Sequence, residues 1–82
     1  MMDFDENDGC EESVARTLNA DGIAETYEKA LEWVRDIYDT FELCCDNGYP
    51  IERAKKMLAE KNYPQEAVDA VIKEWGIESW EW

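Results

Sequence analysis

The stretch that decides the fold is residues 24–46, AETYEKALEWVRDIYDTFELCCD. Its apolar residues recur at spacings of three and four, as expected for one face of an α-helix. They are Tyr27, Ala30, Leu31, Val34, Ile37, Tyr38, Phe41, Cys44 and Cys45. The spacing predicts one long amphipathic helix over residues 24–46, with an apolar stripe that faces a core.

The acidic residues of the same stretch form a second pattern, opposite the apolar stripe. Seven carboxylates fall within about a third of the helix circumference. This carboxylate row consists of Glu25, Glu28, Glu32, Asp36, Asp39, Glu42 and Asp46. At about 1.5 Å per residue the row is roughly 32 Å long, with a carboxylate about every 5 Å. One nucleic-acid strand carries a phosphate about every 3.4 Å, a charge density of the same order.

The row has two interpretations, a partner-binding surface or an ordinary solvated face. Like charges three and four residues apart destabilise a helix by a few tenths of a kcal/mol, and ordinary surfaces intersperse lysines that relieve this. Only Lys29 and Arg35 lie at the margins of the row. We therefore expect the row to bind a partner, with the solvated face as the alternative.

Turn signals divide the rest of the chain into shorter helical segments. The long helix is expected to end at 47–50, Asn-Gly-Tyr-Pro, because glycine suits a helix C-terminus and proline cannot continue the helix. Helical spacing resumes over residues 51–60 and 65–75, and Gly76 follows. The expected core residues are Leu31, Val34, Ile37, Phe41, Leu58, Val68, Val71 and Ile72.

The N-terminal region is expected to hold a flexible arm followed by a short helix that precedes the three core helices. Residues 1–10 are acidic and poor in apolar groups, which predicts a flexible arm. Val14 and Leu18 predict a short helix within residues 11–20. Residues 11–82 then form a single all-α domain, a small three-helix bundle with a long acidic first core helix and a short leading helix.

The composition favours a basic protein partner. The 82 residues include 21 acidic and 8 basic side chains, a formal net charge of −13. Residues 1–46 hold 14 of the acids and 3 of the bases. Such a charge disfavours direct contact with nucleic acid or an anionic membrane and attracts basic surfaces.

The C-terminal half, over about residues 37–76, resembles the ubiquitin-associated (UBA) domain. The resemblance lies in the Gly48-Tyr49 loop, the Met57-Leu58 pair and the Ala67-Val68 pair, although Asn47 replaces the family's loop methionine. It implies a UBA-like three-helix arrangement. It also implies that ubiquitin, or a similar protein, would contact Gly48, Tyr49, Val71, Ile72 and Trp75.

No catalytic apparatus is visible in the sequence. The chain has no histidine, which excludes Ser-His-Asp and Cys-His catalysis, and it has no glycine-rich phosphate loop. Cys10, Cys44 and Cys45 show no metal-ligand spacing and are expected to be reduced thiols. The sequence is expected to contain neither a signal peptide nor a membrane-spanning run. We expect a cytoplasmic, non-enzymatic protein without cofactor or metal.

Three functions fit these features. The first is an inhibitor or regulator that occupies the basic, nucleic-acid-binding surface of a partner protein. In size, charge and helicity the chain resembles small acidic DNA-mimic proteins that phages use against host defence, which would place it in the host cytosol. The second is a UBA-like adaptor, and the third is an acidic assembly subunit. The oligomeric state is left open.

Overall fold

Four α-helices make up the fold, in the order α1 (Asp5–Ala20), α2 (Tyr27–Asp46), α3 (Ile51–Glu60) and α4 (Gln65–Trp75). The computed structural model describes the backbone of residues 5–82 and the side chains of residues 11–82. A 3-10 turn, η1 (Ile77–Ser79), follows α4, and residues 5–82 contain no strand. The all-α class predicted from the sequence is confirmed. None of the helices in this described part is both long and apolar enough to cross a bilayer.

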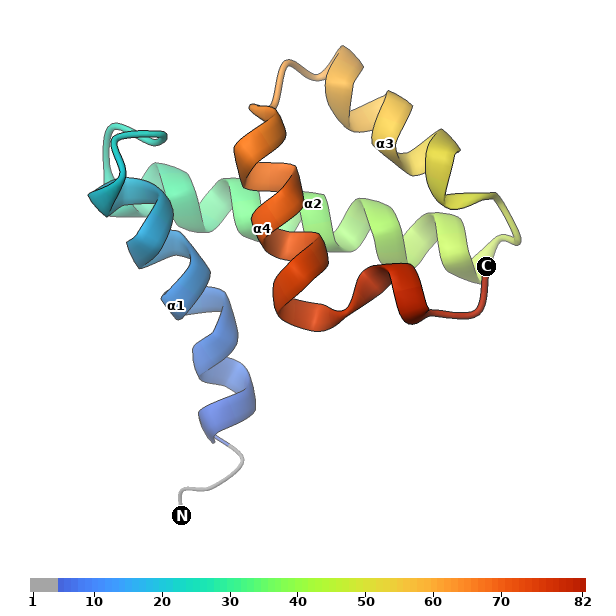
Figure 1. Ribbon diagram of the computed structural model, residues 1–82, viewed down its shortest axis with the longest axis horizontal. Coiled ribbons are helices and arrows are strands. Elements are labelled where there is room, and N and C mark those ends of the chain that lie inside the picture. Colours follow the sequence, from blue (N-terminus) through green and yellow to red (C-terminus); the bar gives the residue numbers. More distant parts are fainter. Residues whose placement is uncertain (1–4) are drawn as a thin grey trace.

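Helix α2 is the element against which the others pack. Figure 1 shows it running the length of the molecule, with α1 near its N-terminal end, α4 across its middle and α3 toward its C-terminal end. The apolar stripe predicted from the spacing is the side of α2 that faces these helices. The buried residues of α2 are Ala30, Val34, Ile37, Thr40, Phe41 and Cys44.

The two ends of α2 are set by local capping. The helix begins at Tyr27, three residues later than expected, because the Thr26 side chain accepts a hydrogen bond from the Lys29 backbone N–H at 3.1 Å. Residues 24–26 therefore precede the helix. The end at Asp46 agrees with the prediction, and Gly48 follows with φ +78°, a conformation that glycine adopts without a Cβ clash.

Helix α1 is longer than the short leading helix expected from the sequence. It begins at Asp5, so it includes six residues of the segment predicted to be an arm, while residues 1–4 lie outside the described residues. Its inner side contributes Val14, Ala15 and Leu18 to the core, where each is at most 5% exposed. Helix α1 is thus an integral part of the fold.

The core holds seven of the eight residues expected there. Leu31 is the exception, because it is half-buried at the edge of the cluster. Other buried residues were not among the eight expected there, and they include Ala54, Ala67 and Ile77, all with 0% exposure. Alanines at these points let helices approach closely, and Ile77 closes the core from beyond α4.

The segment that follows α4 returns to α2 as an aromatic cover. The Trp82 indole N–H donates to the Ile77 carbonyl at 2.8 Å, which holds the segment in a turn. The Trp82 ring lies 6.2 Å from the Phe41 ring, and the Trp80 ring lies 5.6 Å from the Tyr38 ring. Both tryptophans are half-buried, so the segment completes one side of the core rather than projecting from it.

Candidate protein-binding surface on helix α2

The carboxylate row lies on the side of α2 that the other helices leave uncovered. Six of its seven members are on the helix, and Glu25 lies in the turn before it. Asp36 is half-buried, and the other members are exposed: Glu25, Glu28, Glu32, Asp39, Glu42 and Asp46. Because the buried stripe anchors α2, the backbone that carries the exposed carboxylates is held in place.

Asp36 has a structural role within the row. Its carboxylate accepts a hydrogen bond from the Tyr63 hydroxyl and another, at 3.3 Å, from Lys61 Nζ. Both partners lie at the connection between α3 and α4, so Asp36 ties this connection to α2. Burial raises the pKa of Tyr63 to about 12, with help from the Asp36 hydrogen bond and from the charges of Asp36 and Glu32.

Tyr38, on α2 itself, also has a pKa that the charges of the row affect. Burial raises the pKa of Tyr38 above 10.0, and the nearby charges of Glu42 and Asp39 raise it further. Negative charges disfavour the tyrosinate anion, so both tyrosines register the negative potential of the row.

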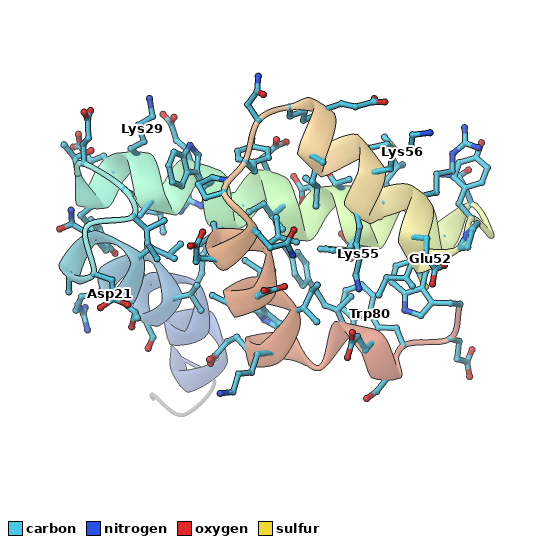
Figure 2. The ribbon with its side chains drawn as sticks, turned by 45° about the horizontal axis from the view of Figure 1, so that its top comes forward. Asp21, Lys29, Glu52, Lys55, Lys56 and Trp80 are labelled. Atoms are coloured by element: carbon cyan, nitrogen blue, oxygen red, sulfur yellow. The ribbon has the colours of Figure 1, made fainter. Side chains whose placement is uncertain are left out.

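The basic side chains near the row neutralise only part of it. Arg35 Nε is 3.0 Å from Glu11 Oε1 of α1, so this cation pairs outside the row. Lys55 points from α3 toward the C-terminal segment (Figure 2), and its Nζ is 3.6 Å from Glu78 Oε2. Lys61 is the only cation in a described salt bridge with a row member, Asp36.

Five exposed carboxylates of α2 therefore form no ion pair with any side chain described here. They are Glu28, Glu32, Asp39, Glu42 and Asp46. We call them the open carboxylates. They span residues 28–46 of the helix, eighteen steps or about 27 Å.

The residues implied by the UBA resemblance do not lie together on one exposed surface. Gly48 and Tyr49 are exposed in the turn after α2. Val71 and Ile72, by contrast, are core residues with 0% and 8% exposure. Trp75 is half-buried, and its ring centroid is 5.1 Å from that of Tyr38.

One exposed residue in the row was not expected from the sequence. Leu43 lies outside the apolar stripe of the helix and is 58% exposed. It follows Glu42 and lies one helical turn from both Asp39 and Asp46. The sequence signal that could have identified Leu43 as exposed was its position on the acidic side of the helix.

The cysteines have packing roles in the described structure. Cys44 is buried, with its Sγ 3.7 Å from Met57 Sδ, and the Cys45 thiol donates to the Glu81 carbonyl at 3.1 Å. The side chain of Cys10 lies outside the described residues. Among the side chains of residues 11–82, no three Cys, Asp or Glu are grouped so as to hold a metal ion.

Comparisons with protein-family models, with curated proteins and with solved structures find no match for this chain.

Proposed function

We propose that this protein is a non-enzymatic inhibitor or regulator that binds the basic, nucleic-acid-binding surface of a partner protein through the open carboxylates of α2. The observation that carries the proposal is the arrangement of these five exposed, unneutralised carboxylates along one side of a single helix. The proposed action is of the DNA-mimic type, in the cytoplasm and without a cofactor.

Electrostatics supports this choice of partner. A surface that holds nucleic acid presents lysine and arginine side chains to a regular series of phosphates. The open carboxylates offer a series of charges of the same order, at about 7 Å of helix per charge, and the whole row of seven carboxylates has about 5 Å per charge. The formal net charge of −13 repels nucleic acid itself and accelerates the approach of a basic surface.

Rigidity supports it as well. Ala30, Val34 and Ile37, on the inner side of α2, are each 0% exposed. The outer carboxylates are therefore attached to a backbone that is already ordered before binding. A preordered surface loses less conformational entropy when it binds, as a duplex edge also does.

Charge reversal on two different surfaces tests the proposal. The α2 triple variant carries Glu32→Lys, Asp39→Lys and Glu42→Lys, and it leaves Asp36 intact because Asp36 holds Tyr63. The control triple variant carries Glu12→Lys, Glu60→Lys and Glu74→Lys, three exposed positions on α1, α3 and α4. Both variants change the net charge equally, so only the position of the charge differs.

The measurement begins with capture of a partner from an extract of the source cell at low salt. The purified partner is then tested for binding to labelled DNA or RNA in the presence of each variant. We expect the parent and the control triple variant to displace the nucleic acid, and the α2 triple variant to lose at least tenfold in affinity. Equal displacement by the two triple variants, or a partner that does not bind nucleic acid, would refute the proposal.

A UBA-like adaptor is the second candidate, favoured by the exposed Gly48-Tyr49 turn between α2 and α3. In this proposal α2, α3 and α4 form the UBA-like three-helix arrangement, with α1 added. The burial of Val71 and Ile72 limits the contact area that it offers. Titration of isotope-labelled ubiquitin tests it: saturable shifts at Gly48, lost in Tyr49→Ala, would support the adaptor over the inhibitor.

A further inference from the structure

Two large apolar side chains are exposed near the C-terminal end of α2, Leu43 in its last turn and Tyr49 in the turn that follows it. Leu43 is 58% exposed and Tyr49 is 40% exposed, and they are the exposed large hydrophobic residues among the side chains of residues 11–82. Leu43 lies within the row, with Asp39, Glu42 and Asp46 as its neighbours on the helix surface. An apolar side chain is thus surrounded by carboxylates.

Both residues are held in place by their surroundings. The Asn47 side-chain amide donates to the Leu43 carbonyl at 2.8 Å, and the Tyr49 backbone N–H donates to the Cys44 carbonyl at 2.9 Å. The Arg53 guanidinium lies 4.3 Å from the centre of the Tyr49 ring, a cation–π contact that orients the ring. An aromatic ring fixed before binding loses little entropy in a complex.

We propose that Leu43 and Tyr49 are the apolar anchor of this surface and that they receive a cationic amphipathic helix of the partner protein. Charge complementarity selects this occupant. A helix with apolar residues at spacings of three and four, flanked by lysine and arginine, would place its apolar stripe on Leu43 and its bases against Asp39, Glu42 and Asp46. Mimicry of nucleic acid by charge alone has no use for either apolar side chain.

This inference rests on the proposed function and adds the chemistry of the partner segment to it. Hot spots of protein interfaces are enriched in tyrosine, and they gain energy where flanking groups exclude water. The open carboxylates would supply attraction and orientation, and the anchor would supply the contact that distinguishes one basic surface from another.

Two synthetic helical peptides of equal length and equal charge provide the probe. One carries lysines with a leucine stripe, and the other carries the same lysines with glutamine in place of leucine. We expect the parent protein to bind the leucine peptide about tenfold more tightly, an increment that burial of part of one leucine side chain can provide. Binding is followed by titration calorimetry at fixed salt.

Three variants separate the anchor from the charge. Leu43→Ser is expected to remove the preference for the leucine peptide while binding of the glutamine peptide stays unchanged. Tyr49→Ser should reduce the preference without abolishing it. The charge control Glu28→Gln, at the opposite end of α2, should weaken both peptides by the same factor. Circular dichroism checks that helicity is retained, since all three positions are exposed.

The outcomes distinguish the inference from the function on which it rests. If the parent binds both peptides equally, or if Leu43→Ser keeps the preference, the anchor is refuted and the anionic surface stands. If the α2 triple variant binds the glutamine peptide as tightly as the control triple variant does, the anionic surface is refuted and the anchor falls with it.

Discussion

Helices α2 and α3 both bury one side, but their outer sides carry different charge patterns: the outer side of α2 is mostly acidic, and that of α3 alternates acids and bases. Each buries an apolar stripe, Val34 and Phe41 among others on α2, and Ala54 and Leu58 on α3. On α3, Lys56 lies four residues from both Glu52 and Glu60, so opposite charges are neighbours. On α2 the neighbours three and four residues apart are mostly acids.

The comparison shows that the negative surface of α2 arises from where its charged residues stand: acids follow acids at helical spacing, and few bases lie between them. Helix α3 shows that this chain can compose an ordinary, mutually neutralised helix surface. Helix α2 instead keeps repulsive neighbours and relies on its buried side for stability. This repulsion, left largely unrelieved, is one ground on which the proposed function rests.

The buried side of α2 should carry the largest energetic effect. We expect Phe41→Ala to destabilise the fold by about 3–5 kcal/mol, because Phe41 is fully buried and its removal leaves a cavity. This is a large share of the free energy of unfolding, which is about 5–15 kcal/mol for folded proteins in general. Urea unfolding followed by circular dichroism measures it. An unchanged midpoint would mean that α2 does not depend on its core contacts.

Within the row, Asp36 should behave unlike its neighbours. We expect Asp36→Asn to destabilise the fold by about 1–3 kcal/mol, since hydrogen bonds to a charged acceptor from Tyr63 and Lys61 are weakened. The matched control is Asp39→Asn, whose exposed carboxylate has no described ion pair, and it should not destabilise the fold and should change the free energy of unfolding by at most about 0.5 kcal/mol. Equal effects of the two variants would show that the row is energetically uniform.

Alkaline pH should weaken the contact between Tyr63 and Asp36, and so the stability of the fold, without any mutation. The pKa of Tyr63 is about 12 in the folded protein against 10.0 ordinarily, so the folded state holds this proton more tightly than the unfolded state does. The stabilisation is fully present below about pH 10 and is lost as pH rises through about 12. Urea midpoints of the parent and of Tyr63→Phe across this window measure the effect. Parallel pH profiles of the two proteins would contradict it.

The smallest effects should have opposite signs on the two helices. Glu42 has Asp39 and Asp46 as its acidic neighbours, so Glu42→Gln should stabilise the fold by about 0.2–0.5 kcal/mol. Lys56 has Glu52 and Glu60 as neighbours, so Lys56→Gln should destabilise it by a similar amount. Thermal unfolding at low salt compares them, and high salt should shrink both changes. Changes of the same sign would remove the contrast between the helices.

The sequence by itself determined the features that depend on local spacing. The periods of three and four predicted α2, α3 and α4, and the turn residues at 47–50 and Gly76 marked helix ends. The carboxylate row follows from the same helical spacing, because successive residues on one side of a helix are three or four positions apart. The start of α2 was missed by three residues, since the choice of Thr26 as cap depends on one side-chain hydrogen bond.

Tertiary structure alone decided which members of these patterns are free. Asp36 is engaged by residues 25 and 27 positions away, and Arg35 is paired with a residue 24 positions away. Likewise, Val71 and Ile72 are buried as their spacing predicted, but only the packing of the helices leaves Leu31, which has the same kind of spacing, half-buried at the edge of the core. Helical periodicity states which residues share a side, but the mutual placement of helices distant in sequence states whether that side is covered. The open carboxylates therefore became visible only when the four helices were seen together.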